Sequence, residues 1–304
     1  MRIKDIDPSY AMLKYVCDRF ELNLEQRYWL AFIYSLTYCG ASTFFVYNEF
    51  PDFENLDSGR LNRWWNNGGR QQTLCQTDRR WVRSNNLFVP AVEAYRKWVG
   101  DQSQHDHFQS IAIGDTPEQR YDRVYRKAAH LPSYGQFALF LYLEALHTIT
   151  PLELAPTDLN LDEAWSCRNG LFYAYGLDQW ITEKGEKTPW DSRGEMKLVW
   201  NDLRSKLQPE STVWQIETTL CAYKKFYRGK RYLGYYIDRQ ALEIAKMAAQ
   251  VKDGVAWEVL WQFRSETYDP NYLVETKFKN PTTLSPYWVS LQNTKTKEIL
   301  ADGY

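Results

Sequence analysis

Apolar positions recur three and four residues apart along most of this chain, the spacing of one face of an α-helix. In the stretch 238–250, for example, Ala241, Ile244, Ala245 and Ala248 would share a face. Alternation of apolar and polar positions, which is typical of a half-buried strand, is scarce. The segment 255–261 fits a helix as well as a strand. The pattern therefore predicts an all-α fold.

Capping signals indicate where several helices begin. Asn23 stands three residues before Gln26, and Thr116 is followed by proline and, at the third position, by glutamine. Both arrangements satisfy backbone N–H groups at a helix start. We expect Gly40 to end the first of these helices. Further helices are predicted at 87–99, 137–146, 162–175, 193–207, 212–227 and 238–250.

Turn-forming residues cluster at 150–156 and at 182–191. The sequence has no internal repeat, low-complexity tract or obvious linker. We therefore expect residues 1–304 to form a single helical enzyme unit, with two lobes that divide near these segments. The segment 280–288 is irregular and is expected to wrap back over the body.

Composition limits the class of protein. A hydrophobic content of 44% and a charged content of 25% suit a soluble globular protein. The longest apolar run, 137–143, is too short to cross a bilayer, so we predict a cytoplasmic protein without membrane contact. A net charge of −1 gives no global basic field, and any DNA contact must come from local patches. The five cysteines include no C-x-x-C pair and are expected to be reduced thiols.

Two cationic stretches supply such patches. The first, 76–86, contains Arg79, Arg80 and Arg83 around Trp81. The second, 222–236, alternates cations with aromatic rings: Lys224, Lys225, Lys230, Arg231, Tyr232, Tyr235 and Tyr236. Arginine forks suit phosphate oxygens, and aromatic rings stack on unpaired bases. Either stretch alone fits a solvated helix face, but the two together favour a nucleic-acid interface.

A third segment, 130–138, resembles the hairpin of helix-hairpin-helix DNA glycosylases, whose pattern is Leu-Pro-Gly-x-Gly before a helix. Ser133 replaces the first glycine of that pattern and Gly135 matches the second. Backbone N–H groups at such a turn can bind a DNA phosphate. Phe137 occupies the position of the nucleophilic lysine of many such enzymes, which argues against a Schiff-base lyase. Asp158 follows Pro156, as their catalytic aspartate follows a proline-containing turn. A plain helix–helix turn accounts for the same residues.

Several segments together resemble one family. They are 28–32, 47–54, 76–86, 165–170, 217–226 and 229–236. The chain is similar in these segments to the phage α-glutamyl/putrescinyl thymine pyrophosphorylase family, also described as amino acid:DNA transferases. That family is distantly related to helix-hairpin-helix glycosylases, which implies a helical, two-lobed fold of that kind.

The resemblance implies hypermodification of thymine in bacteriophage DNA, inside the infected host. An amine (an amino acid such as glutamate or glycine, or the polyamine putrescine) would displace pyrophosphate from the 5-methylene carbon of pyrophosphorylated 5-hydroxymethyluracil. The partners would be DNA containing the modified thymine and the amine. No cofactor is expected, although the pyrophosphate itself could hold a Mg²⁺ ion. His105 and His107 have a metal-like spacing, but histidines of a polar loop are usually solvated.

The resemblance also implies residue roles. The leaving pyrophosphate or the DNA phosphates would contact Arg79, Arg80, Arg83, Lys224, Lys225, Lys230, Arg231, Ser133 and Gly135. A flipped base would stack on Trp81, Tyr232, Tyr235 or Tyr236. The proton of the amine would pass to a carboxylate, first Asp78 or Glu217 and then Asp158. Asn48 and Glu49 would bind the amine.

Each assignment has a structural alternative. Asp78 could pair with Arg79, and Glu217 could bond to Thr218 or Lys224. Asn48 and Glu49 could cap the turn at Phe50 and Pro51, and Arg168 with Asn169 could be a helix-end feature. Two other functions fit the same residues. One is a glycosylase-type base hydrolase that depends on Asp158, and the other is a non-catalytic DNA-binding protein.

Overall fold

The computed structural model describes residues 7–228, 235–251 and 254–268. Within these ranges every regular element is a helix, which confirms the all-α prediction. The ambiguous segment 255–261 contributes to a helix, α15 (Trp257–Thr267). The predicted roles of Lys230, Arg231 and Tyr232, and the prediction for 280–288, lie outside the described residues.

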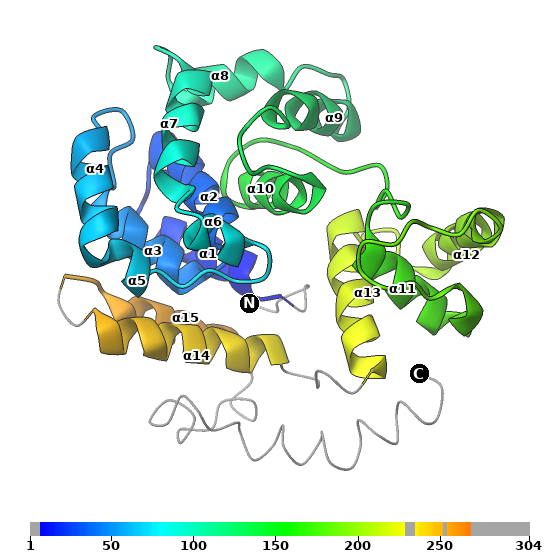
Figure 1. Cartoon of the computed structure of the whole chain (residues 1–304). Coiled ribbons are helices and arrows are strands. Elements are labelled where there is room, and N and C mark those ends of the chain that lie inside the picture. The colour runs from blue at the N-terminus through cyan, green and yellow to red at the C-terminus, as the bar shows by residue number, and fades with distance from the viewer. Residues whose placement is uncertain (1–6, 229–234, 252–253, 269–304) are drawn as a thin grey trace. The chain divides into compact units, whose positions relative to one another are not determined.

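The chain divides into two compact units, which we describe separately (Figure 1). Among the described residues, the first unit holds 8–154 and 239–268, and the second holds Asp7 and 155–238. The division falls after Leu154 and within helix α14 (Tyr235–Gln250). The segment 182–191 lies inside the second unit.

The first unit is built around two helices, α2 (Leu24–Thr37) and α10 (Gln136–Ile149), which pack against each other. All residues of α2 from Tyr28 onward are buried, as expected for a central helix that is apolar on every side. Phe32 of α2 stacks on Tyr95 with ring centroids 3.8 Å apart. The surrounding helices are α1 (Ser9–Arg19), α3 (Gly40–Glu49), α4 (Ser58–Trp64), α5 (Arg70–Gln72), α6 (Arg79–Ser84), α7 (Phe88–Val99), α8 (Gln104–Ile111), α9 (Pro117–Ala128), α14 and α15.

Both predicted helix starts are confirmed. Asn23 and Gln26 form a reciprocal capping box at α2, with two bonds of 3.0 Å. The Thr116 hydroxyl accepts the Gln119 N–H at 3.3 Å at the start of α9. The other predicted helices are present with ends that differ from the predicted ones by three residues or fewer.

The prediction for Gly40 is wrong. Helix α2 ends at Thr37 because Tyr38 adopts the left-handed conformation, with φ 47°. Gly40 instead begins α3, where the methyl carbon of Met12 would lie 2.1 Å from an added Cβ atom. This glycine therefore allows α1 and α3 to approach closely, a tertiary reason that local pattern does not reveal.

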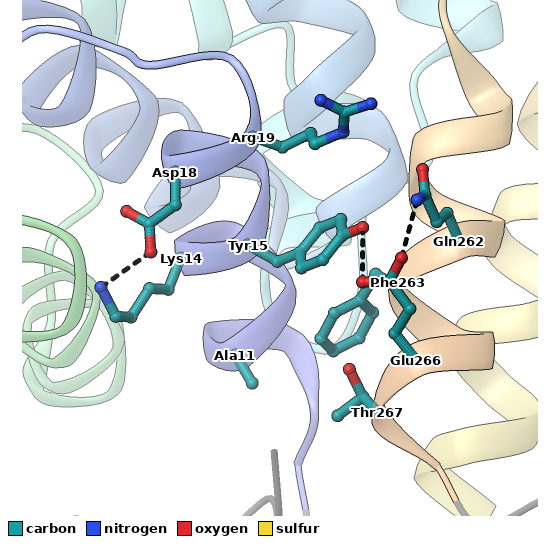
Figure 2. Close-up of a pocket in the computed structure, with 9 residues that line it drawn as sticks. All are labelled: Ala11, Lys14, Tyr15, Asp18, Arg19, Gln262, Phe263, Glu266 and Thr267. Carbon is teal, nitrogen blue, oxygen red and sulfur yellow. Dashed lines mark hydrogen bonds and ion pairs between the residues drawn. The ribbon is translucent and has the colours of Figure 1, made fainter.

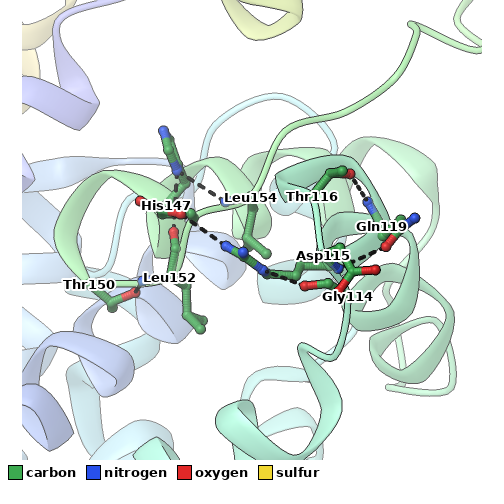
Figure 3. A network of polar contacts seen from close by, with 10 residues as sticks. Gly114, Asp115, Thr116, Gln119, His147, Thr150, Leu152 and Leu154 are labelled. Atoms are coloured by element: carbon green, nitrogen blue, oxygen red, sulfur yellow. Dashed lines mark hydrogen bonds and ion pairs between the residues drawn. The ribbon is translucent and has the colours of Figure 1, made fainter.

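A polar network fixes the last residues of the first unit (Figure 3). Arg120 of α9 donates to the carbonyl of Gly114 at 3.0 Å and to Glu153 at 2.9 Å. The Leu154 N–H donates to Nδ1 of His147 at 3.3 Å. Burial lowers the pKa of His147, so the imidazole is suited to accept this bond. The network therefore holds the last residues of the first unit against α9 and α10.

The second unit is a smaller group of helices. It comprises α11 (Trp165–Ala174), a short 3₁₀ turn (Asp178–Trp180), α12 (Ser192–Lys206) and α13 (Val213–Tyr227). Thr212 and Gln215 form a capping box at the start of α13. Helices α11 and α13 are packed together along their length. They approach closely where Gly170 faces the backbone of Leu220.

We expect Gly170→Ala to disrupt this unit. An added Cβ would lie 2.0 Å from the carbonyl oxygen of Leu220, which is backbone and cannot turn aside. Overpacking of this kind costs about 1–3 kcal/mol or more in the free energy of unfolding. Urea denaturation monitored by circular dichroism measures the loss.

The matched control is Gly194→Ala in α12, where nothing lies within 4 Å of the added carbon. That change should leave stability unaltered or raise it by up to about 1 kcal/mol. Equal stability of the two variants would contradict the proposed close contact between α11 and α13.

Candidate active site

A hub of hydrogen bonds fixes the start of α11 in the second unit. Arg168 is fully buried and donates from Nη1 to the carbonyls of Leu161 and Asp162 at 3.0 and 2.7 Å. Its Nη2 donates to the Thr182 hydroxyl at 2.9 Å. The indole N–H of Trp165 donates to the Thr182 carbonyl at 2.7 Å. Arg168 thus joins α11 to the segment before it and to the loop after it, a larger role than the expected helix-end feature.

Beside this hub, the side chain of Lys224 reaches from α13 to α11. It has no exposed surface, and its Nζ lies 2.5 Å from the Ser166 hydroxyl oxygen. The ammonium also lies 3.5 Å from the centre of the Trp165 ring. Burial lowers the pKa of Lys224 to about 8. A lysine so enclosed does not suit direct contact with a DNA phosphate.

Two turns before Lys224 on the same helix stands Glu217. The thiol of Cys167 donates to its Oε1 at 3.2 Å, and the hydroxyl of Thr218 lies 3.5 Å from its Oε2. Desolvation raises the pKa of this carboxyl, and the nearby negative charge of Asp7 raises it further. A carboxylate with a raised pKa binds a proton more strongly, and perturbed groups of this kind are enriched at active sites. The contact between Glu217 and Thr218, which was expected as the structural alternative, is present. The environment of Glu217 also suits proton transfer.

Positive charge continues along the end of α13. Lys225 and Arg228 follow Lys224, and their positive charges further lower the pKa of Lys224. The Arg228 guanidinium lies 3.9 Å from Glu183, at the limit of an ion pair. Nearby, Tyr173 stacks on Tyr227 with centroids 4.3 Å apart. The second unit thus combines a proton-binding carboxyl, a buried lysine and further cations within two packed helices.

In the first unit, Arg79 joins two segments that the sequence singled out separately. It is 6% exposed, and its Nη1 donates to the carbonyl of Ser133 at 3.0 Å. Ser133 has φ 68°, the left-handed conformation that favours the glycine of the hairpin pattern. Tyr134 is buried and bonds through its hydroxyl to Ser35. Arg79 therefore supports the turn between α9 and α10.

The remaining residues of the first cationic stretch have different settings. Arg83 donates to the Thr73 carbonyl at 3.1 Å, whereas Arg80 is exposed and bonds to Gln76 at 3.2 Å. Trp81 is 58% exposed, a high value for so large an aromatic side chain. Asp78 is exposed at the start of α6 and its side chain does not cap that helix. Asp78, Arg80 and Trp81 are the predicted site residues of this stretch that face solvent.

Other predicted site residues lie in ordinary structural settings. Asn48 donates to the Gly254 carbonyl at 2.6 Å, in place of capping the Phe50 turn, and Glu49 lies 3.9 Å from Arg60. The carboxylate of Asp158 is exposed and accepts the Asn160 N–H at 2.7 Å. Tyr236 is buried and makes an edge contact with Tyr235, whose ring centroid is 5.5 Å away. Gly135 is exposed and precedes α10.

The described residues hold neither a candidate metal-binding cluster nor a helix that could span a membrane. No cluster of three or more His, Cys, Asp or Glu side chains within the described ranges could hold a metal ion. His107 is buried and its Nδ1 lies 3.1 Å from Gln102. None of the described helices combines the length and the apolar character that a bilayer span requires.

An open pocket of about 590 Å³ lies between α1 and α15 in the first unit (Figure 2). Of its charged groups, Lys14 binds Asp18 at 3.0 Å and Glu266 accepts a hydrogen bond from Tyr15 at 3.0 Å, and Arg19 is the remaining charged residue of the lining. Gln262 also donates to Glu266, at 2.7 Å. This internal pairing leaves the cluster between α11 and α13 as the better candidate for chemistry.

Comparison with known proteins identifies the class. The family described as amino acid:DNA transferase matches residues 2–232, and the chain belongs to this family. The chain is also 23% identical, over 266 residues, to a serinyltransferase of Salmonella phage ViI. That alignment covers 80% of this chain and 64% of the relative, so the chain spans less than two thirds of the relative's length. No solved structure matches the chain.

Ser166 and Cys167 belong to the cluster between α11 and α13, although the sequence patterns did not single them out. They lie in the segment 165–170, whose match to the family drew attention only to Arg168 and Asn169. A serine and a cysteine on one helix are common, and only the packing against α13 brings them to Lys224 and Glu217.

The settings of the arginines predict different effects on stability. Arg79→Ala should lower the free energy of unfolding by about 1–3 kcal/mol, because a buried hydrogen bond to Ser133 is lost. Arg80→Ala, at an exposed position of the same helix, should change it by less than about 0.5 kcal/mol. Denaturation curves give both values, and hydrogen exchange of residues 130–138 should accelerate only in the first variant. Equal stability would show that Arg79 does not support the turn.

Proposed function

We propose that the protein transfers an amine onto the 5-methylene carbon of pyrophosphorylated 5-hydroxymethyluracil in DNA, with release of pyrophosphate. Membership of the amino acid:DNA transferase family supports transfer of an amino acid to DNA. The observation that carries the proposal is the cluster between α11 and α13, which lies within the matched residues 2–232. It combines a carboxyl of raised pKa, Glu217, with the buried Lys224.

In the proposed step a carbon–nitrogen bond forms as the carbon–oxygen bond to pyrophosphate breaks. The electron pair of the broken bond leaves with the pyrophosphate. The nitrogen loses a proton to a carboxylate, for which we propose Glu217 ahead of Asp78 and Asp158. Because its pKa is raised, the ionised carboxylate of Glu217 is a stronger base than an unperturbed carboxylate. A Mg²⁺ ion held by the pyrophosphate would supply further positive charge.

We propose an amino acid as the incoming nucleophile, with serine the first to be tested. The relative from Salmonella phage ViI is named a serinyltransferase, and the family name specifies amino acids. Glutamate, glycine and putrescine are the other amines of this reaction class that the test must include. Asn48 and Glu49 keep the proposed role in amine binding.

For the DNA, we propose contacts of two kinds. The turn at Ser133 and Gly135 would bind a phosphate, in a helix-hairpin-helix manner that the left-handed Ser133 supports. Cations would contact the DNA or the pyrophosphate: Arg80, Arg83, Lys225, Lys230 and Arg231, whereas Arg79 is buried against the Ser133 turn and would act by supporting that turn. The base would be flipped and would stack on an aromatic ring, for which the exposed Trp81 is better suited than the buried Tyr236. Tyr232 and Tyr235 are alternatives. The reaction would take place in the cytoplasm of an infected bacterium.

The test uses the full chain and DNA that contains 5-pyrophosphoryloxymethyluracil. Pyrophosphate release is measured with serine, glutamate, glycine, putrescine or no amine, and the nucleosides are then analysed by mass spectrometry. We expect release that depends on one amine, together with the matching mass gain on thymidine. Loss of the base would indicate a glycosylase, and retention of DNA with no release would indicate a binding protein.

Trp81→Ala should weaken binding of single-stranded DNA by about 1–3 kcal/mol, the usual value for one stacked base. The matched control is Trp190→Ala, since Trp190 is 78% exposed and lies outside the proposed interface. Fluorescence anisotropy with a labelled oligonucleotide measures both. Equal affinity of the two variants would remove Trp81 from the interface.

A further inference from the structure

The cluster between α11 and α13 contains one hydroxyl whose own proton is available for a ligand. Ser166 is partly exposed, and its oxygen receives a hydrogen bond from Nζ of Lys224 at 2.5 Å. A serine hydroxyl has one proton and two acceptor positions. With one acceptor position occupied by the ammonium, the proton can point away from Lys224. Its sulfur neighbour, Cys221 at 3.2 Å, is a weak acceptor that an anionic oxygen would displace.

The surroundings of Lys224 keep its charge directed at Ser166. The Trp165 ring covers the ammonium on one side, and the bond from the indole N–H to Thr182 holds that ring in place. The titratable and charged groups that face Lys224 come from both helices. On α13 and its C-cap they are Glu217, Cys221, Lys225 and Arg228, and on α11 there is Cys167. Lys225 and Arg228 add positive charge around Ser166, which favours a strongly anionic ligand.

We infer that Ser166 donates a hydrogen bond to the oxygen through which pyrophosphate leaves, and that Lys224 strengthens this bond by donating its own hydrogen bond to the Ser166 oxygen. The inference rests on the proposed function and assigns a residue to its leaving-group side. Ser166 is the catalytic residue, because it touches the reacting oxygen. Lys224 is a positioning residue that acts through Ser166, which explains how a lysine without exposed surface can serve the reaction. Ser166 keeps its proton throughout, and the electron pair of the broken bond stays on pyrophosphate.

The arrangement has a defined dependence on pH. Lys224 supports the bond only when it is protonated, and burial places its pKa at about 8. Activity should therefore fall as the pH rises through about 8. The incoming amine must lose a proton before it attacks, and this requirement raises activity as the pH rises. The two effects together give a bell-shaped profile of activity against pH.

The experiment measures kcat and KM from pH 6 to 10 for the wild type, Ser166→Ala and Lys224→Arg. Ser166→Ala should lower kcat about 100-fold or more, the usual loss of one donor to developing charge, with little change in KM for DNA. Lys224→Arg keeps the charge at every pH, so the fall above pH 8 should disappear. Ser205→Ala and Lys206→Arg, both on exposed positions of α12, are the matched controls and should behave as wild type.

Binding of inorganic pyrophosphate, measured by calorimetry, tests the same contact without turnover. Ser166→Ala should weaken it about 10-fold, and this variant decides the question even if Lys224→Arg fails to fold. A kcat of Ser166→Ala within threefold of wild type, with unchanged pyrophosphate affinity, would overturn the inference and leave the proposed function intact. Absence of transfer by the wild type would instead overturn the proposed function, and the inference with it.

Discussion

The close approach of α11 and α13 at Gly170 is the constraint on which the candidate active site depends. With no side chain at this position, the backbone of α11 lies against the carbonyl of Leu220. That separation lets Lys224 reach Ser166 and lets the thiol of Cys167 reach Glu217. Both contacts join one helix to the other, so both distances would increase if the helices moved apart. A single small residue therefore sets the chemistry of the cluster.

The first unit shows a comparable dependence on one side chain. Arg79 belongs to a cationic stretch, yet its guanidinium is buried against the turn at Ser133. The charge is used internally, to hold a turn whose serine adopts a conformation that favours glycine. Arg80 and Trp81 of the same helix remain accessible because Arg79 and Val82 are the residues that α6 buries. Structural and functional roles are thus divided among neighbouring residues.

Much of the fold could be predicted from the sequence, because helix periodicity and capping are local properties. The helix starts at Asn23 and Thr116 and the long apolar helix α2 are of this kind. The error at Gly40 arose because its reason for being glycine lies in Met12, on another helix. For the site, charge pattern indicated Lys224 and Glu217 but could not show that Lys224 is enclosed. Ser166 and Cys167 acquire their importance only through contacts about fifty residues away in the chain.

The enclosure of Lys224 has a consequence for ionic strength. In the proposed function, exposed cations such as Arg80 would interact with DNA through water, and dissolved salt screens such interactions over a Debye length of about 8 Å at physiological concentration. The ammonium of Lys224 lies between an indole ring and a hydroxyl, where mobile ions have no access. In the proposed function, salt would therefore weaken the binding of DNA far more than it changes the field at Ser166. A salt-sensitive binding surface would then be separate from a salt-insensitive site of bond breaking.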